Sequence, residues 1–251
     1  MIKILGVIPA RWASSRFEGK SIVPLCGKPL IRWVIERARQ AKRLDEVIVA
    51  TDDDRIRLIA EQADCRVIMT RSDLASGTDR VAQAVKIFGG RPEAIINIQG
   101  DEPLVDPNLI DRLAEVITAE RSWDMVTAAA PIACEADLNN KAIVKVVFGD
   151  MDQALYFSRL AIPFVRDTGI KSNQPIHWRH IGIYLYSLPF LERLVHASPC
   201  LLEQVEKLEQ LRALSLGARI KIVKTSQASL AVDTPSDVKV VESAIKQAGL
   251  G

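Results

Sequence analysis

The chain has 251 residues, 48% of them hydrophobic, which is enough to bury a substantial core. Its 33 Lys and Arg residues nearly balance 31 Asp and Glu residues, and a net charge of +2 argues against a general nucleic-acid-binding protein. No apolar run approaches the ~18 residues of a membrane span, and the apolar N-terminal stretch is too short for a signal peptide, so we expect a cytoplasmic protein without membrane insertion.

Short apolar runs alternate with helical patterns over the first half of the chain. Runs typical of buried strands cover residues 2–8, 46–51, 66–69, 94–99 and 124–130. Apolar spacing of the helical kind covers residues 29–44, 56–63, a short stretch from about 78, and a stretch that begins after Pro107. This alternation predicts an α/β, Rossmann-like fold, with a mostly parallel central sheet and helices on both faces.

From about residue 140 the pattern becomes rich in strands. Strand-like runs cover residues 142–148, 153–157, 180–187 and 218–224, and only two long helices are predicted, one over residues 201–217 and one that starts at Thr234. No Gly/Ser-rich linker separates this region, so we predict one domain, 1–251, with a smaller β-rich extension. The four cysteines lack CxxC spacing and are interpreted as small buried hydrophobes in a reducing compartment.

The stretch SSRFEGKS, Ser14 to Ser21, differs from a Walker A phosphate loop at its first position. A Walker A loop runs directly into a helix whose N-terminus holds the phosphates. Here Pro24 and Gly27 follow Lys20 too closely for a helix to start there. We therefore reject a P-loop.

The charges of this loop allow two interpretations. Arg11, Arg16 and Lys20 lie close together, with Ser14 between them, after the first predicted strand. The loop is either a solvated basic segment or an anion cradle, in which guanidinium, ammonium and hydroxyl groups bind phosphate oxygens.

Two acids are candidates for a metal site. Asp101 follows the strand at 94–99, where Gly100 allows close approach of the backbone. Asp233 stands just before Thr234-Pro235, which predicts a well-specified helix start. Two fixed carboxylates near a phosphate site suit Mg²⁺ and a phosphoryl or nucleotidyl transfer.

Polar residues in the C-terminal half of the chain suggest one wall of a ligand-binding site. Strand periodicity puts His180 and Tyr184 on one face, opposite aliphatic residues. In the predicted helix at 201–217, Glu209 lies inside or beside the apolar stripe, so it is either paired or directed at a ligand. Arg159 ends a strand and is a candidate partner for a carboxylate.

The order of several motifs resembles the 3-deoxy-D-manno-octulosonate (Kdo) cytidylyltransferase family, also called CMP-Kdo synthetases. The motifs, which span nearly the whole chain, are IPARWASSRFEGK, ATDDDRI, SGTDR, NIQGDEP, VKVV, ALYFSRLAIPF, RHIGIYLY, EKLEQLRAL and VDTPSD. The resemblance implies that CTP and Kdo react with Mg²⁺ to give CMP-Kdo and pyrophosphate, for lipopolysaccharide synthesis. It also implies a homodimer, with residues 1–135 mainly binding CTP and residues 136–251 serving sugar binding and dimerisation.

The resemblance also implies roles for single residues. Catalytic roles fall to Lys20, Asp101, Asp233 and Arg11, and the metal ligands are Asp101 and Asp233. The nucleotide contacts are Ala10, Arg11, Ser14, Arg16, Lys20, Ser76, Arg80 and Gln99. The sugar contacts are Gln99, Arg159, His180, Tyr184, Glu209 and Gln210, with Arg159 as the carboxylate partner.

Three alternatives remain open at this point. The sugar can be an 8-amino analogue of Kdo or a nonulosonate, or the protein can be an inactive nucleotide-sugar-binding or regulatory protein. The family usually has Pro where this chain has Glu18, an acid two residues from Lys20. From the sequence alone, replacing Glu18 with Pro is not expected to lower activity.

Overall fold

The computed structural model describes residues 3–13, 17–167, 175–226 and 230–250. The chain divides into two compact units. Unit 1 comprises Met1–Glu115 together with Ser229–Gly251, and unit 2 comprises Val116–Ala228. The last segment of the chain therefore belongs to the same unit as the first, a division that differs from the two halves expected from the sequence.

Unit 1 contains a parallel sheet. Its strands are β1 (Ile4–Ala10), β4 (Glu46–Thr51), β5 (Arg66–Met69) and β6 (Ala94–Asn97). They lie in the order β6-β1-β4-β5, and all three neighbouring pairs are parallel. β1, β4 and β6 are almost wholly buried, which explains why their sequences are continuous apolar runs without polar alternation.

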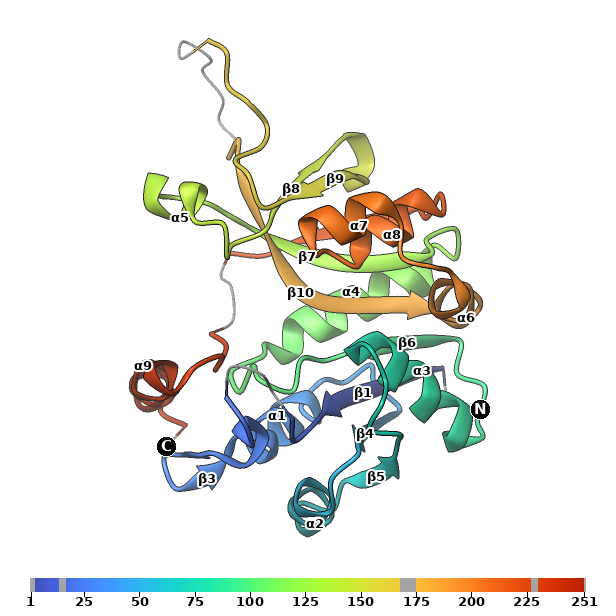
Figure 1. Cartoon of the computed structure of the whole chain (residues 1–251), viewed down its shortest axis with the longest axis vertical. Coiled ribbons are helices and arrows are strands. Elements are labelled where there is room, and N and C mark those ends of the chain that lie inside the picture. Colours follow the sequence, from blue (N-terminus) through green and yellow to red (C-terminus); the bar gives the residue numbers. More distant parts are fainter. Residues whose placement is uncertain (1–2, 14–16, 168–174, 227–229, 251) are drawn as a thin grey trace. The chain divides into compact units, whose positions relative to one another are not determined.

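Helices flank this sheet (Figure 1). They are α1 (Leu30–Ala38), α2 (Asp54–Gln62) and α3 (Gly77–Phe88), whereas α4 (Pro107–Ala119) crosses the boundary of the units and α9 (Pro235–Gln247) packs elsewhere in unit 1. The connections through α1 and α2 lead from β1 to β4 and from β4 to β5, in one direction along the sheet. The connection through α3 leads from β5 back past β1 to β6. Right-handed crossovers therefore put α1 and α2 on one face and α3 on the other. The direction changes between β1 and β6, and ligands of open α/β sheets bind at such a switch point.

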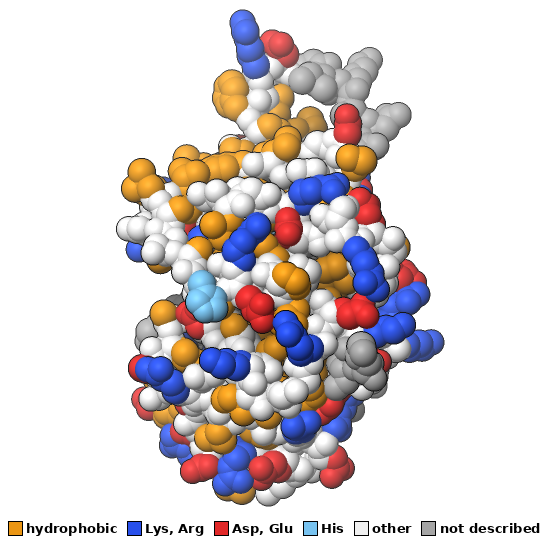
Figure 2. Space-filling view, turned by 90° about the vertical axis from the view of Figure 1, so that its right-hand side faces the viewer, with side chains coloured by type: hydrophobic (Ala, Val, Ile, Leu, Met, Phe, Trp, Pro, Cys, Tyr) orange, Lys and Arg blue, Asp and Glu red, His pale blue; other side chains and the backbone are white. Residues whose placement is uncertain are grey.

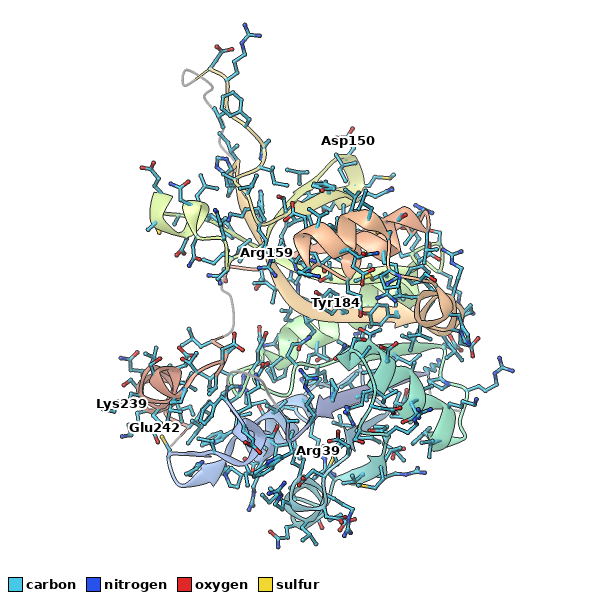
Figure 3. All side chains as sticks on the ribbon, viewed as in Figure 1. Arg39, Asp150, Arg159, Tyr184, Lys239 and Glu242 are labelled. Carbon is cyan, nitrogen blue, oxygen red and sulfur yellow. The ribbon has the colours of Figure 1, made fainter. Side chains whose placement is uncertain are left out.

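The C-terminal helix is joined to a small hairpin of unit 1. The hairpin consists of β2 (Pro24–Leu25) and β3 (Lys28–Pro29), after a 3-10 turn, η1 (Lys20–Ile22). The Cys26 amide donates to Glu242 Oε1 at 2.8 Å, and Figure 3 shows Glu242 on α9. The single turn at Lys20 confirms that no phosphate-loop helix starts there.

Unit 2 contains a mixed sheet. Its strands are β7 (Met125–Pro131), β8 (Lys145–Phe148), β9 (Ala154–Ser158), β10 (Trp178–Ser187) and β11 (Ile220–Lys224). β7 pairs in parallel with β11 and antiparallel with β10, and the β8–β10 and β8–β9 pairs are antiparallel. The shorter elements are α5 (Glu135–Asn139), η2 (Asp150–Asp152), α6 (Leu188–His196), α7 (Leu201–Glu206) and α8 (Gln210–Ser215). The predicted α/β fold, with a mostly parallel sheet flanked by helices, is confirmed.

The prediction of one helix over residues 201–217 is wrong. α7 ends at Glu206, because Lys207 takes a left-handed conformation with φ of 55°. Leu201 and Val205, expected on the buried stripe, are 75% and 71% exposed. The break sets the Glu206 and Lys207 carbonyls where the Arg159 guanidinium binds them, a contact that periodicity cannot predict.

The sequence predicts no membrane span and four buried cysteines. Within the described residues, no helix is long and apolar enough to cross a membrane. The four cysteines are free thiols, but only Cys65 is buried and Cys134 is exposed, so the interpretation of all four as buried hydrophobes is wrong.

Candidate active site

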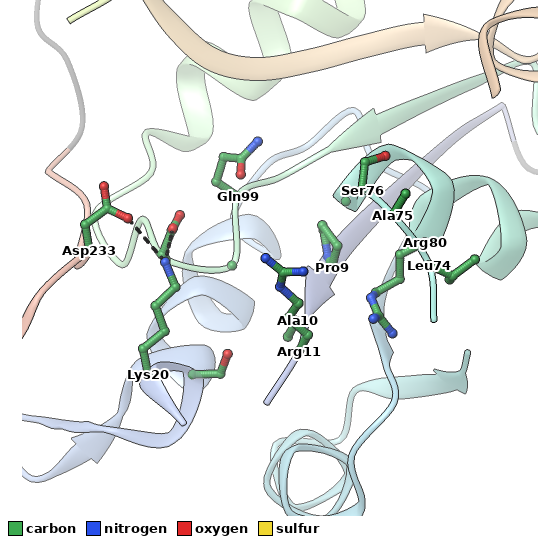
Figure 4. A pocket seen from close by; sticks show the side chains of 14 residues that line it. Pro9, Ala10, Arg11, Lys20, Leu74, Ala75, Ser76, Arg80, Gln99 and Asp233 are labelled. Carbon is green, nitrogen blue, oxygen red and sulfur yellow. Dashed lines mark hydrogen bonds and ion pairs between the residues drawn. The ribbon is translucent and has the colours of Figure 1, made fainter. Parts of the chain in front are cut away.

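A cavity of about 280 Å³ lies in unit 1 at the carboxyl ends of β1 and β6 (Figure 4). Side chains and backbone from five separate segments line it. They are Pro9, Ala10, Arg11, Lys20, Ser21, Leu74, Ala75, Ser76, Gly77, Arg80, Gln99, Gly100, Asp101 and Asp233. The cavity therefore brings together all but two of the predicted catalytic and nucleotide-binding residues. The two exceptions, Ser14 and Arg16, lie outside the described residues.

Lys20 is the centre of an ion-pair cluster in this cavity. Its Nζ lies 2.5 Å from Asp101 Oδ2 and 3.4 Å from Asp233 Oδ1. The side chains of Lys20, Asp101 and Asp233 are 17%, 22% and 40% exposed, so all three are accessible to a ligand. One ammonium between two carboxylates leaves one formal negative charge at the cluster.

The backbone explains how two distant acids meet. The Val232 amide donates to the Asp101 carbonyl at 2.9 Å, which ties the C-terminal segment to the loop after β6. Thr234 and Asp237 form a capping box at the predicted start of α9, and the Asp233 amide donates to Asp237 Oδ2 at 3.0 Å. Asp233 is therefore held by a rigid helix start.

Gly100 is required by close approach of two backbones. A Cβ atom at this position would lie 2.6 Å from the Pro9 carbonyl oxygen, well inside van der Waals contact. Only glycine lets the loop that carries Asp101 lie against the end of β1, as the sequence predicted.

Arg80 belongs to the wall of the cavity and is 3% exposed. Its guanidinium donates to Asp52 Oδ2 at 2.9 Å and to Thr70 Oγ1 at 2.5 Å. Ser76 caps α3 in a capping box with Asp79, so Ser76 stands at a defined helix start. Arg80 therefore presents a fixed surface to the cavity.

The base of the basic loop is clamped around Trp12. The indole Nε1 donates to Glu18 Oε1 at 2.8 Å, and the Arg55 guanidinium lies 3.1 Å from the ring centroid. A Cβ atom on Gly19 would meet the ring at 2.8 Å, so glycine is needed beside it. Asp53 in turn binds Arg55 through two nitrogens, at 2.9 and 2.6 Å. The Glu18 carboxylate is therefore engaged with Trp12.

The donor set of the Lys20 cluster fits a hard divalent cation. Asp101 and Asp233 offer carboxylate oxygens that already converge on one positive group. Within the described residues, no group of three or more His, Cys, Asp or Glu side chains is close enough to hold a metal ion by itself. A metal held here would need further oxygens, such as phosphate and water, and Mg²⁺ is commonly bound in this way.

A second cavity, of about 320 Å³, lies in unit 2. It is formed by β10, the segment before β8 and the break between α7 and α8. Its lining residues are Ala142, Ile143, Val144, Arg179, His180, Gly182, Tyr184, Lys207, Leu208, Glu209 and Gln210. Four of the predicted sugar contacts therefore share one cavity, and Tyr184 is seen on β10 in Figure 3.

Arg159, the predicted carboxylate partner, is not among these lining residues. Its guanidinium donates to three backbone carbonyls, those of Glu206 at 2.8 Å, Lys141 at 3.1 Å and Lys207 at 3.4 Å. Its own amide donates to Glu206 Oε2 at 3.0 Å. Figure 3 shows Arg159 beside the helical segment of unit 2. The structure therefore gives Arg159 the geometry of a brace between two segments of the cavity wall.

Lys145 is a second brace and is fully buried. Its Nζ donates to the carbonyls of Asn140 at 2.8 Å, Ile143 at 2.9 Å and Arg159 at 2.8 Å. Burial, together with the charge of Arg159, lowers the pKa of Lys145. All three of its donors are directed at main chain, so Lys145 holds the wall in place.

Reasoning from sequence missed the residues that support the two cavities. Asp52 lies in the ATDDDRI motif, but the motif assigned it no role. Thr70, Thr127, Lys145 and Glu206 stand in ordinary strand or helix patterns. Their roles arise from contacts across the fold, which leave no local signal.

The comparison with known families is decisive for the class of protein. The sequence model of the cytidylyltransferase family matches residues 5–222. The chain belongs to this family. It is therefore a nucleotidyltransferase enzyme, as the sequence motifs predicted.

Several relatives of this cytidylyltransferase match over nearly its whole length. A 3-deoxy-manno-octulosonate cytidylyltransferase of Bdellovibrio bacteriovorus is 46% identical over 250 residues, covering 99% of this chain and 100% of the relative. An 8-amino-3,8-dideoxy-manno-octulosonate cytidylyltransferase of Shewanella pealeana is 45% identical over 239 residues, covering 94% and 96%. A solved structure of CMP:2-keto-3-deoxy-manno-octonic acid synthetase complexed with CTP is 34% identical, with a TM-score of 0.92, covering 98% of this chain and 99% of that chain. The α/β nucleotidyltransferase fold is thereby confirmed.

Proposed function

We propose that this enzyme transfers CMP from CTP to Kdo, giving CMP-Kdo and pyrophosphate for lipopolysaccharide synthesis. The observation that carries the proposal is the convergence of Lys20, Arg11, Asp101 and Asp233 on one cavity at the switch point of a parallel sheet. Such a cavity suits a polyanion that must be held while one phosphorus atom is attacked. The CTP in the similar solved structure and the names of the relatives support the choice of nucleotide and sugar.

In this proposal the basic groups bind the triphosphate. Lys20 and Arg11 contact phosphate oxygens, and charge-assisted bonds orient the α-phosphate toward the incoming hydroxyl. Ala10, Ser76, Arg80 and Gln99 surround the nucleotide. Because Lys20 already sits between two carboxylates, a ligand that displaces it from them frees its ammonium for phosphate.

Asp101 and Asp233 would hold Mg²⁺. When bound, a divalent cation supplies charge that lowers the pKa of the attacking hydroxyl and stabilises the negative charge that develops on the phosphate. The two acids keep fixed positions through the Asp101 carbonyl and the capping box of α9, so the ligand geometry is set before substrate binds.

His180, Tyr184, Glu209 and Gln210 would contact the sugar acid in the cavity of unit 2. Arg159 is proposed as a brace of this cavity, because its donors are directed at backbone carbonyls. Since CTP is a cytoplasmic nucleotide, we infer that the reaction takes place in the cytoplasm.

A second candidate substrate is the 8-amino analogue of Kdo. It is favoured by one specific observation, since relatives named for that sugar are nearly as similar to this chain as those named for Kdo. Kdo is preferred here because the Kdo-named relative aligns over more of both chains.

We also propose that the enzyme is a homodimer through unit 2. Among the described residues, more than half of the exposed large hydrophobic side chains belong to this unit, and hydrophobic side chains are uncovered on one of its faces in Figure 2. They are Met151, Leu155, Leu160, Phe164, Ile176, Leu201, Leu202 and Val205. Covering such residues by a second copy removes apolar area from water. Analytical ultracentrifugation tests this proposal, and a monomer at micromolar concentration contradicts it.

Pyrophosphate release tests the proposed reaction. The enzyme is assayed with Mg²⁺ and each of the four ribonucleoside triphosphates, and with Kdo, 8-amino-Kdo or N-acetylneuraminate. The highest kcat/KM is expected with CTP and Kdo. Preference for 8-amino-Kdo would select the second candidate, and CTP binding without release for any sugar would identify a binding or regulatory protein.

A further inference from the structure

His180 is held in unit 2 by the hydroxyl of a buried threonine. Thr127, on β7, is wholly buried, and its Oγ1 lies 2.9 Å from His180 Nε2. The same oxygen lies 2.7 Å from the Ile183 carbonyl and 3.2 Å from the Ile181 carbonyl. One hydroxyl therefore faces three polar atoms of β10.

A β-bulge in β10 creates this arrangement. Ile181 pairs with Ala128 and Tyr184 pairs with Thr127, so two residues of β10 stand between neighbouring residues of β7. A bulge locally disrupts the ladder of backbone hydrogen bonds and re-aims nearby side chains. Thr127 occupies the disruption, and its hydroxyl reaches the carbonyls that the bulge displaces.

The single proton of the hydroxyl decides which tautomer His180 adopts. Carbonyl oxygens only accept, and two oxygens 2.7 Å apart need a proton between them. The Thr127 proton must therefore lie on the hydrogen bond to Ile183 O. The hydroxyl then accepts from His180, so Nε2 carries the ring proton and Nδ1 carries a lone pair.

The surroundings of the ring keep it neutral and oriented. Phe157 meets it edge-on with ring centroids 4.9 Å apart, and the Tyr184 ring lies 5.4 Å away. Burial lowers the pKa of His180 to about 3. Among the described residues, Nδ1 of His180 makes no hydrogen bond. His180 lines the same cavity as Glu209, whose carboxylate accepts hydrogen bonds.

We propose that Thr127 is a positioning residue that holds His180 as the Nε2–H tautomer, so that Nδ1 accepts a hydrogen bond from a hydroxyl or ammonium group of the sugar acid. The tautomer follows from the geometry alone, and the sugar contact rests on the proposed function. The cavity then selects ligands that donate at this point, which both Kdo and its 8-amino analogue do.

NMR of the ring nitrogens tests the tautomer without any substrate. The chain has three histidines, so protein labelled with ¹⁵N-histidine shows three ring spin systems. The variants His177→Gln and His196→Gln assign two of them and leave His180. At pH 7 the expected spectrum of His180 has a protonated Nε2 and an unprotonated Nδ1. A protonated Nδ1 overturns the proposal.

Paired variants test the positioning role. In Thr127→Val the hydroxyl is lost at nearly constant volume, and we expect mixed tautomers and a rise in the KM for Kdo of about three- to tenfold, the effect of one hydrogen bond. The KM for CTP is expected to stay unchanged. Thr127→Ser keeps the hydroxyl and should restore both the tautomer and the KM. Equal KM values in the two variants would show that Thr127 only packs, and would overturn the positioning role.

Titration with Kdo separates this inference from the proposed function. If the enzyme uses Kdo, the Nδ1 resonance of His180 should move on binding by more than the Nε2 resonance. Turnover of Kdo without that movement overturns the sugar contact. The Nε2–H tautomer together with no turnover of any octulosonate would contradict the proposed function and leave the role of Thr127 standing.

Discussion

The two cavities of this molecule handle charge in opposite ways. In unit 1, Lys20 is paired with both Asp101 and Asp233, and all three side chains remain partly exposed and accessible to a charged ligand. In unit 2, Arg159 and Lys145 are committed to backbone carbonyls. Accessible charges suit a triphosphate with a metal ion, whereas charges committed to backbone carbonyls keep the cavity wall of unit 2 in a fixed shape. The predictions below test that contrast, from the largest expected effect to the smallest.

The largest effect is expected from Asp101→Asn, in the ion-pair cluster of Lys20, Asp101 and Asp233. Loss of a carboxylate that balances Lys20 and would hold the metal should lower kcat by about 10²–10³-fold or more, the scale of one electrostatic group in a catalytic site. Steady-state pyrophosphate release measures the change. Asp73→Asn removes a surface acid paired with Arg71 and serves as the control. Retained turnover in Asp101→Asn, with the control also active, would contradict the role of Asp101.

Arg159→Lys tests whether the Arg159 guanidinium holds the segments of the unit 2 cavity wall together through their backbone carbonyls. A lysine cannot reach the three carbonyls that the guanidinium binds, so the free energy of unfolding should fall by about 2 kcal/mol. The KM for Kdo should rise together with this loss. Denaturant unfolding and kinetics measure the two quantities, with Arg193→Lys as an exposed control. Unchanged stability with a higher KM for Kdo alone would instead make Arg159 a direct carboxylate ligand.

Substitutions of Glu18 test whether its hydrogen bond with the Trp12 indole supports binding of CTP. The structure changes the expectation for this residue, because its carboxylate accepts the hydrogen bond of the Trp12 indole. Glu18→Ala and Glu18→Pro should raise the KM for CTP about three- to tenfold, while Glu18→Gln, which keeps an acceptor, should stay near the unsubstituted enzyme. Glu61→Ala, at a surface ion pair, is the control. A normal KM in Glu18→Pro would show that the clamp does not position the loop.

The effect that is smallest near neutral pH concerns His180. Its pKa is about 6.5 in the unfolded chain and about 3 in the folded chain, so the unfolded state binds more protons between these values. The contribution of neutral His180 to stability is complete above pH 6.5 and is lost as the pH falls toward 3, by at most about 1.4 kcal/mol per pH unit. Arg179, Lys207 and Glu209 are the charged groups that line the same cavity.

His180→Asn is the matched variant for this measurement. Its free energy of unfolding should depend less steeply on pH between 6.5 and 5 than that of the unsubstituted protein, as measured by urea unfolding at each pH. Parallel curves for the two proteins would mean that His180 is not held neutral.

Much of unit 1 follows from local sequence. Buried parallel strands are continuous apolar runs, and the strand at 46–51 appears with the bounds that this pattern predicts. The strand at 66–69 also has the predicted bounds, although it is largely exposed. The capping box at Thr234 and Asp237 is also a local signal. Asp101 was placed correctly because an acid after a buried strand must project at the edge of the sheet.

Unit 2 was less predictable because its key contacts join residues far apart in the chain. The apolar spacing at 201–217 predicts a helix, but the left-handed Lys207 breaks it where Arg159, 48 residues away, binds the carbonyl. The proposed role of Thr127 could not be predicted for the same reason, because it depends on a bulge in β10, 54 residues away.

The sequence by itself determined the alternation of strands and helices in unit 1, the residues proposed to bind phosphate and metal, and the resemblance to a family. These depend on periodicity and on residue types at short spacing, which the chain carries locally. Only the tertiary structure decided that Lys20 stands between Asp101 and Asp233, that Glu18 binds Trp12, and that Arg159 donates to three backbone carbonyls. Each of these depends on which donors and acceptors meet once the backbone is folded, because a buried polar group takes the partner that the fold brings to it.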